Sequence, residues 1–197
     1  MNIVELVKKA MELRNKGLRP GEIADELNVS SETVTWLLTR PTKEAPKDIF
    51  VDWSKIGSSS QRMSYIASAL TDMVLESLDN GLDIDVVVGV ALSGIPFASL
   101  VADELGVELA VFLPSKHRAE REGVKGTFSR NFAQVKGRKC IIIDDVITTG
   151  STMKETVEVL EELGSKPLAI SVMIDKKGLD SIAGAPLYSL IKMDRVE

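Results

Sequence analysis

Residues 140–152 read CIIIDDVITTGST and contain the most specific pattern in the chain. The apolar run Cys140–Ile143 predicts a buried strand, and the residues from Ser151 onward have the apolar spacing of a helix. Two adjacent carboxylates, Asp144 and Asp145, follow the strand, and a glycine among hydroxyl residues connects them to the helix. A strand joined to a helix by a short turn is the unit from which parallel α/β sheets are built.

The remainder of the chain after the first 57 residues repeats this unit. Helical periodicity covers 58–78, 95–106 and 151–163, and further apolar runs predict strands at 84–92, 107–113, 139–144 and 167–174. Continuous apolar runs are typical of strands that are covered on both faces. We therefore predict an α/β fold in which helices flank a parallel sheet on both faces.

The first part of the chain predicts a separate all-α domain. Residues 1–43 have helical spacing interrupted by short breaks, and residues 44–57 begin with a polar segment rich in proline and charge. Proline resists both helix and sheet, so this segment reads as a linker. We expect a helical domain at 1–43, a linker at 44–57 and the α/β domain at 58–197.

Within the helical domain, residues 20–40 have the pattern of a helix-turn-helix. Asn28 stands at the turn, where a residue tolerant of positive φ is needed, and Ser30 or Ser31 can cap the second helix. The small Ala24 allows two helices to cross closely. The predicted core consists of Ile23, Ala24, Leu27, Val29, Val34 and Leu37.

The second of these helices predicts a DNA-binding face. Its outward residues are expected to be Ser31, Thr33, Thr35, Thr39 and Arg40, with Trp36 partly outward. Hydroxyl groups and arginine contact phosphates and base edges in the major groove. The alternative is a helical hairpin that only packs or dimerises. Because charges in residues 1–43 nearly cancel, one domain would bind DNA weakly, and a homodimer with two domains would bind more tightly.

The composition excludes several classes of protein. The net charge of −5 over 197 residues argues against general polyanion binding, so any contact with double-stranded DNA must be local. No apolar run reaches the roughly 18 residues of a membrane span, and the charged start differs from a secretory signal. The single cysteine, Cys140, fits a reducing, cytoplasmic location, and its apolar surroundings predict a buried, inert thiol.

The residues after the strand at 139–144 predict a site for a ribose 5-phosphate. Asp144 and Asp145 can accept hydrogen bonds from a vicinal diol or reach a metal ion through water. The turn offers hydroxyls and helix amides to an anion, supported by the helix dipole, and its residues are Thr148, Thr149, Gly150, Ser151 and Thr152. The alternative is a capped helix after a strand with two solvated acids.

This pattern, IIIDDVITTGST, resembles the phosphoribosyl diphosphate signature of type I phosphoribosyltransferases. The resemblance implies that Asp144 and Asp145 hold the ribose hydroxyls, that Ser93 and Gly94 form a diphosphate loop, and that Mg²⁺ accompanies the diphosphate. It also places the flexible catalytic loop at 115–127, a polar segment that predicts a mobile lid. The candidates in that lid are Lys116, His117 and Arg118, and the candidate catalytic residues are Asp144, Asp145 and Lys116.

The basic residues of the lid do not match the register of the catalytic loop in the orotate phosphoribosyltransferases, and two further positions depart from those enzymes. Ser93 stands where those enzymes have a lysine, and Lys176 follows Asp175 where they have an arginine. The whole chain resembles the archaeal orotate phosphoribosyltransferase-like transcriptional regulators, which as a family control sugar catabolism genes. The resemblance implies a cytoplasmic, homodimeric DNA-binding regulator that senses phosphoribosyl diphosphate or a related sugar phosphate. The alternative is an active, Mg²⁺-dependent phosphoribosyltransferase acting on orotate or another nucleobase.

Overall fold

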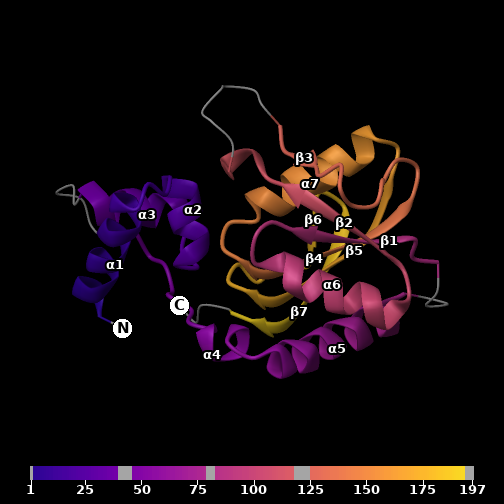
Figure 1. Cartoon of the computed structure of the whole chain (residues 1–197), viewed down its shortest axis with the longest axis horizontal. Coiled ribbons are helices and arrows are strands. Elements are labelled where there is room, and N and C mark those ends of the chain that lie inside the picture. Colours follow the sequence, from indigo (N-terminus) through magenta and orange to yellow (C-terminus); the bar gives the residue numbers. More distant parts are fainter. Residues whose placement is uncertain (1, 40–45, 79–82, 118–124, 194–197) are drawn as a thin grey trace. The chain divides into compact units, whose positions relative to one another are not determined.

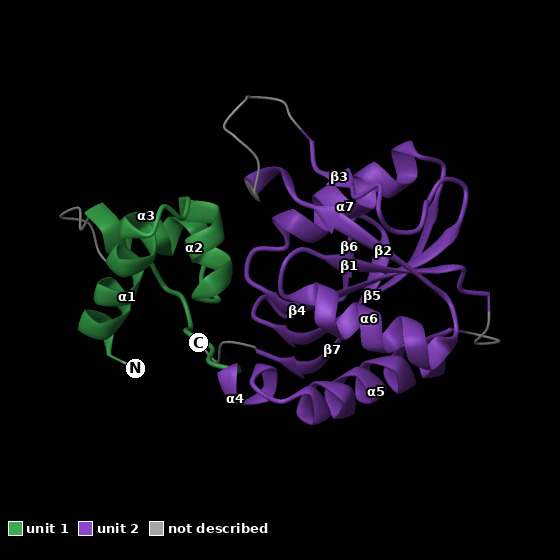
Figure 2. Ribbon diagram, in the orientation of Figure 1, with its two compact units in different colours: residues 1–53 green, residues 54–197 purple. Residues whose placement is uncertain are grey.

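The computed structural model describes residues 2–39, 46–78, 83–117 and 125–193. The chain forms two compact units, residues 1–53 and residues 54–197, which Figure 2 distinguishes by colour. None of the described helices is long and apolar enough to cross a bilayer.

The first unit contains three helices, α1 (Ile3–Asn15), α2 (Pro20–Glu26) and α3 (Ser31–Thr39). Helix α1 begins with a capping box in which the Asn2 side chain and the Glu5 carboxylate each accept the other residue's backbone N–H. The turn before α3 contains Asn28 at a φ of 51°, which confirms the expected left-handed turn. All six predicted core residues are buried, together with Val7 and Ala10 of α1.

Residues 46–53, which the sequence placed in the linker, pack on this helical unit instead. Asp48 and Val51 accept hydrogen bonds from residues of the α2–α3 region, and Phe50 packs against the core of the unit. The boundary between the two compact units therefore falls between Trp53 and Ser54 along the chain. A polar, proline-rich composition excluded helix and sheet, but it did not exclude an ordered extended segment held by side-chain hydrogen bonds.

The second unit contains a seven-stranded sheet in the order β3-β2-β1-β4-β5-β7-β6 (Figure 1). Its strands are β1 (Val86–Val90), β2 (Glu108–Leu113), β3 (Thr127–Phe128), β4 (Lys139–Ile147), β5 (Lys166–Asp175), β6 (Ser181–Ile182) and β7 (Ala185–Lys192). The strands β2, β1, β4, β5 and β7 run parallel, and β3 and β6 pair antiparallel at the two edges.

The predicted parallel α/β sheet is confirmed for its four central strands. The short strands β3 and β6 and the partly exposed β7 were not predicted from the sequence. Strands β3 and β6 have two residues each, too few for periodicity to be visible. Strand β7 ends in residues with half-buried or exposed side chains, so its sequence lacks the continuous apolar run that marked its neighbours.

Helices cover both faces of the sheet. Helix α7 (Ser151–Glu162) packs on one face, where Met153, Val157 and Leu160 join the core formed with strand residues such as Val88 and Ile142. Helices α5 (Ser60–Ser77) and α6 (Gly94–Leu105) bury apolar residues on the opposite side, preceded by the short α4 (Ser54–Gly57). A 3₁₀ turn, η1 (Ser115–His117), follows β2.

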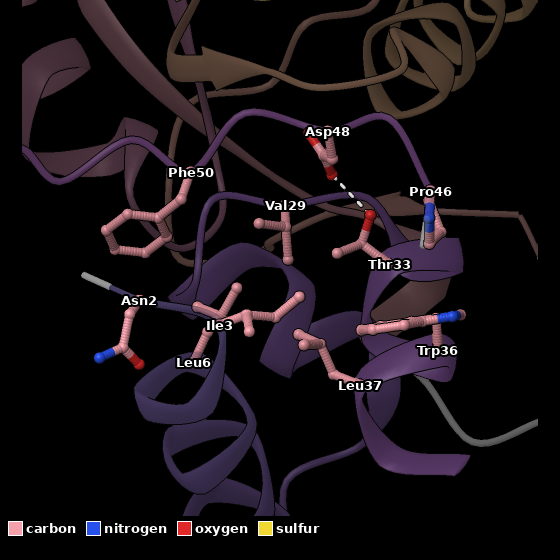
Figure 3. A pocket seen from close by; sticks show the side chains of 10 residues that line it. All are labelled: Asn2, Ile3, Leu6, Val29, Thr33, Trp36, Leu37, Pro46, Asp48 and Phe50. Atoms are coloured by element: carbon pink, nitrogen blue, oxygen red, sulfur yellow. Dashed lines mark hydrogen bonds between the residues drawn. The ribbon is translucent and has the colours of Figure 1, made fainter. Parts of the chain in front are cut away.

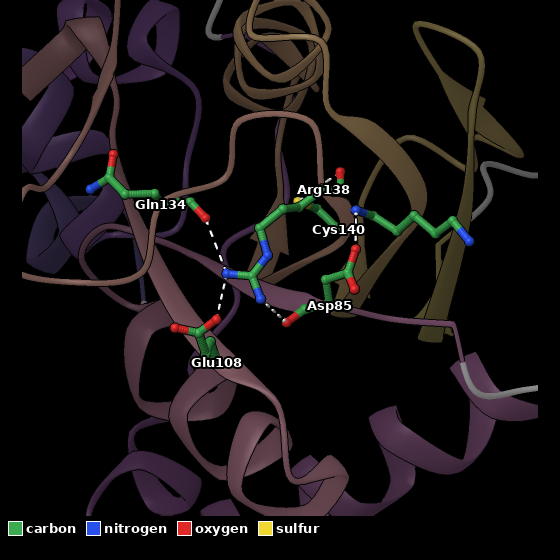
Figure 4. A network of polar contacts seen from close by, with 6 residues as sticks. Asp85, Glu108, Gln134, Arg138 and Cys140 are labelled. Atoms are coloured by element: carbon green, nitrogen blue, oxygen red, sulfur yellow. Dashed lines mark hydrogen bonds and ion pairs between the residues drawn. The ribbon is translucent and has the colours of Figure 1, made fainter.

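A polar network joins the amino-terminal ends of β1, β2 and β4 (Figure 4). The Arg138 guanidinium forms an ion pair with Glu108 and donates to the carbonyl oxygen of Asp85 at 3.2 Å. The Asp85 carboxylate accepts the Lys139 N–H at 2.8 Å. Behind this network, burial raises the pKa of the Cys140 thiol to about 12, which supports an inert core residue. The predicted site residues lie at the opposite, carboxyl-terminal edge, where open α/β sheets generally bind ligands.

Candidate functional site

The acid pair lies at the carboxyl-terminal half of the central strand β4. The strand was expected to end at Asp144, but it continues to Ile147, and Asp144 pairs with Val172 of β5. Both Asp144 and Asp145 are buried, and the Asp145 N–H donates to Asp144 Oδ1 at 2.9 Å. Because the backbone here is part of the ladder, the positions of Asp144 and Asp145 along the sheet are fixed before any ligand binds.

The electrostatics of the pair favour a partner with hydrogen-bond donors. Burial, and then the neighbouring Asp145 carboxylate, raise the pKa of Asp144 well above its usual range, while the positive charge of Lys116 opposes this shift. A carboxylate whose charge is poorly solvated gains most from new donors. Two vicinal hydroxyls or a hydrated cation would supply them.

The turn from β4 into α7 contains the residues of the predicted anion site, and we call this turn the cradle. Gly150 adopts a φ of 83° and precedes the helix without a side-chain cap. The Thr149 hydroxyl lies 2.9 Å from the Ser151 hydroxyl and accepts the Ser151 N–H at 3.3 Å. Thr148 and Thr152 are half-buried beside them. The cradle therefore combines first-turn amides and hydroxyls at the positive end of a twelve-residue helix.

The loop between β1 and α6 approaches the acid pair directly. Ser93 has helical dihedrals and is half-buried, and Gly94 begins α6 in a buried position. A Cβ atom on Gly94 would lie 2.7 Å from the Ile143 carbonyl oxygen and 2.8 Å from Asp144 Oδ1. The absence of a side chain at Gly94 is thus what brings the predicted diphosphate loop against the predicted ribose site.

We expect Gly94→Ala to weaken binding of phosphoribosyl diphosphate at least about tenfold, because such overpacking costs about 1–3 kcal/mol or displaces the loop from Asp144. Calorimetry with Mg²⁺ present measures the affinity. Ser99→Ala, an exposed change on the same helix, is the control and should bind normally. Wild-type affinity in Gly94→Ala would contradict a ligand site at this loop.

The two ends of the predicted lid are held by one side chain that the sequence did not single out. Glu155 of α7 accepts the Ser115 N–H at 3.2 Å and the Gly126 N–H at 2.8 Å, one with each carboxylate oxygen. Lys116 lies between these two points in sequence, close enough for its charge to lower the pKa of Asp144. Nothing in the local sequence marked Glu155, because its partners are distant in the chain. Arg118 and the His117 side chain lie outside the described residues.

The segment after β5 covers the cradle from the other side. The fully buried Asp175 accepts the backbone N–H groups of Lys177 and Leu179 at 2.8 and 2.7 Å, so its carboxylate shapes this turn. A Cβ atom on Gly150 would lie 3.5 Å from both Leu179 and Ile182. Lys176 therefore follows a structural aspartate at the carboxyl edge of the sheet, next to the anion cradle.

In the helical unit, α3 exposes only part of the predicted DNA-binding face. Ser31, Thr35 and Thr39 are exposed, and Trp36 is half-buried against the core. The expectation for Thr33 was wrong, since it is buried and donates to Asp48 Oδ2 at 2.8 Å. The sequence did not reveal the burial of Thr33 because its hydrogen-bond acceptor, Asp48, lies outside the two helices of the helix-turn-helix. Arg40 lies outside the described residues.

Known proteins are similar to this chain in both of its units. The model of the phosphoribosyl transferase domain covers residues 54–181. A transcriptional regulator named GfcR from Methanocella arvoryzae is 55% identical over 205 residues, with 100% of this chain and 99% of that protein covered. The GfcR of Methanothrix thermoacetophila is 56% identical, with 99% and 98% covered.

Solved structures support the fold of the second unit. Orotate phosphoribosyltransferase from Aeropyrum pernix superimposes with a TM-score of 0.59 at 20% identity, covering 77% of this chain and 82% of that one. Adenine phosphoribosyltransferase from Thermoanaerobacter pseudethanolicus gives 0.58 at 21% identity, covering 77% and 92%. At these identities the similarity shows the fold alone and does not identify a substrate.

Proposed function

Because the chain belongs to the phosphoribosyl transferase domain family and to that of the GfcR transcriptional regulators, we propose that it is a DNA-binding regulator controlled by a sugar phosphate. The observation that carries the proposal is the full-length match to these regulators, with 100% of this chain covered at 55% identity. The match includes the helical unit, which an enzyme would not need for its chemistry.

The first unit would bind double-stranded DNA through α3. Its exposed residues Ser31, Thr35 and Thr39 follow one another at intervals of four and line one stripe of the helix. Short hydroxyl side chains on such a stripe suit the edges of bases and the phosphates of a major groove. A homodimer would present two such helices to paired half-sites, in the cytoplasm where the DNA lies.

The second unit would bind phosphoribosyl diphosphate or a related sugar phosphate at the carboxyl edge of the sheet. Asp144 and Asp145 would accept the ribose hydroxyls, residues 148–152 would hold the 5-phosphate, and Ser93–Gly94 would face the diphosphate. Mg²⁺ in such a complex would be bound largely by diphosphate oxygens and water. The acid pair could accept hydrogen bonds from that water.

A second candidate is phosphoribosyl transfer, in which a nucleobase nitrogen bonds to ribose C1 as diphosphate leaves. The observation that favours it is the intact acid pair with the Lys116 charge close by. Lys116 could then stabilise the leaving diphosphate. Two residues argue against an orotate substrate. Ser93 stands where the orotate enzymes have a lysine, and Lys176 lacks the forked guanidinium with which arginine holds a carboxylate.

Two binding measurements test the proposal on the full chain. Fluorescence anisotropy with a duplex selected by the protein from a random pool measures DNA affinity, and calorimetry with phosphoribosyl diphosphate and Mg²⁺ measures ligand affinity. We expect both to bind and the ligand to change DNA affinity. Absence of sequence-specific DNA binding at moderate salt would reject the regulator. Release of diphosphate with any nucleobase would instead establish the transferase.

A further inference from the structure

We call residues 46–53 the strap. The strap provides an acidic acceptor for the N-terminal cap of α3. Ser30 Oγ accepts the Thr33 N–H at 3.1 Å, as an N-cap serine does. In a capping box the acid that accepts the N-cap N–H stands three residues later. Here that position is Thr33, and the acid is Asp48, whose Oδ2 accepts the Ser30 N–H at 2.7 Å and the Thr33 hydroxyl at 2.8 Å.

The strap makes two further attachments to the same region. The Asn28 side-chain amide, at the turn between α2 and α3, donates to the Val51 carbonyl oxygen at 3.0 Å. Phe50 packs against the core of the unit. The strap therefore contacts both the turn and the first residues of the helix that would enter the DNA groove.

Figure 3 shows the hydrogen bond between Asp48 of the strap and Thr33 of α3. A pocket of about 180 Å³ lies between the strap and the helices, lined on its apolar side by Leu6, Leu37 and Trp36 and on its polar side by Asp48 and Thr33. This open space adjoins Asp48 and Thr33, so a shift of the strap at this point displaces few packed side chains, whereas Phe50 packs against the core. Asp48 is the contact such a shift would break.

The cap matters because α3 is short. A helix of nine residues is marginal by itself, so its first turn depends on satisfied N–H groups. The carboxylate of Asp48 also lies near the positive end of the helix dipole. Without Asp48, the Ser30 N–H and the buried Thr33 hydroxyl would both lose this acceptor. The placement of Ser31 and Thr35 thus depends on a residue outside the helix pair.

The strap leads directly into the ligand-binding unit, which begins at Ser54. We propose that the strap transmits the ligand state of that unit to the recognition helix, with Asp48 as the positioning residue, an inference that rests on the proposed function. A ligand that favours one arrangement of the second unit would shift the strap and so strengthen or release the cap. The sugar phosphate would then change DNA affinity without touching the helical unit.

Three variants of the full chain test this transmission. Asp48→Ala removes the acceptor, and we expect DNA affinity to fall about tenfold, as loss of a helix cap predicts, while phosphoribosyl diphosphate affinity stays within about twofold. Ile49→Ala is the matched control, since it shortens an exposed side chain of the same strap. It should behave as wild type in both assays.

The third variant inserts Gly-Gly-Ser between Trp53 and Ser54, which keeps every cap contact but slackens the connection. We expect normal basal DNA and ligand affinities, with the effect of phosphoribosyl diphosphate on DNA affinity lost. If Asp48→Ala does not fold, the insertion variant still tests whether the strap transmits the ligand state. Hydrogen exchange in residues 28–39 should respond to ligand in wild type and not in the insertion variant.

Measurements on the wild-type chain separate a failure of the proposed function from a failure of the role of the strap. If the wild-type chain binds no DNA or no ligand, the proposed function fails and the transmission role fails with it. If wild type binds both and the insertion variant responds to phosphoribosyl diphosphate as fully as wild type does, the role of the strap is overturned while the proposed function stands. Unchanged DNA affinity in a folded Asp48→Ala chain would overturn the role of Asp48.

Discussion

Replacing Asp144 by asparagine should nearly abolish binding of phosphoribosyl diphosphate and should also make the unliganded chain more stable. Binding falls because a carboxylate that accepts ligand hydroxyls contributes about 1.5–3 kcal/mol per hydrogen bond, so we expect a loss of about 100-fold or more. Stability rises because asparagine carries no charge to desolvate, and its side-chain oxygen can still accept the Asp145 N–H. Calorimetry and thermal unfolding measure the two effects.

The size of the stability effect depends on pH. Burial raises the pKa of Asp144 in the folded chain, so at intermediate pH the folded state holds a proton that the unfolded state has lost. The free energy of unfolding therefore contains a favourable contribution that is complete below the ordinary aspartate pKa. That contribution is lost as pH rises through the raised pKa of the folded chain. In Asp144→Asn this decline should be absent, which unfolding curves at a series of pH values can test.

Glu158→Gln is the control for Asp144→Asn. Glu158 is an exposed carboxylate of α7 whose pair with Lys154 spans 3.8 Å, so its removal should change neither stability nor ligand affinity appreciably. If the Asp144→Asn chain binds phosphoribosyl diphosphate as tightly as wild type, the ribose does not bind at Asp144. If Asp144→Asn lowers the free energy of unfolding, the free protein already stabilises the charged Asp144 carboxylate.

A glutamate in place of Thr35 should reduce DNA affinity by about 100-fold, since a like charge pressed against the phosphates or base edges of a groove costs several kcal/mol. Thr35 is exposed in the middle of α3, and its hydroxyl donates to the Ser31 carbonyl oxygen of its own helix at 2.9 Å. The substitution therefore leaves the core of the unit untouched. Anisotropy with the selected duplex measures the loss.

Thr35→Gln isolates the charge from the change of size. Glutamate and glutamine have similar length and similar helix propensity, so the two variants should be equally stable. We expect Thr35→Gln to lose much less affinity than Thr35→Glu, and both to bind phosphoribosyl diphosphate as wild type does. Equal DNA affinities for the two variants would mean that α3 does not face the nucleic acid.

Features built from neighbouring residues were predictable from the sequence. The left-handed turn at Asn28 and the helix core around it depend on residues within about one helix length, so spacing alone revealed them. The central parallel strands were visible because each is buried on both faces and therefore continuously apolar. The edge strands were not, because β3 and β6 are too short for a period and β7 is partly exposed.

The same division holds for the candidate sites. The acids at 144–145 and the cradle at 148–152 are consecutive in the chain, so their chemistry could be inferred from thirteen letters without any knowledge of packing. The contact of Gly94 with Asp144, the two hydrogen bonds of Glu155 and the cap from Asp48 each join residues that are distant in sequence. Such contacts exist only once strands and helices have packed, and burial and hydrogen-bond satisfaction then assign each side chain its partner. For that reason residues 140–152 already indicated a sugar phosphate, whereas the burial of Thr33 and the strap that would connect ligand to DNA became visible only in the folded chain.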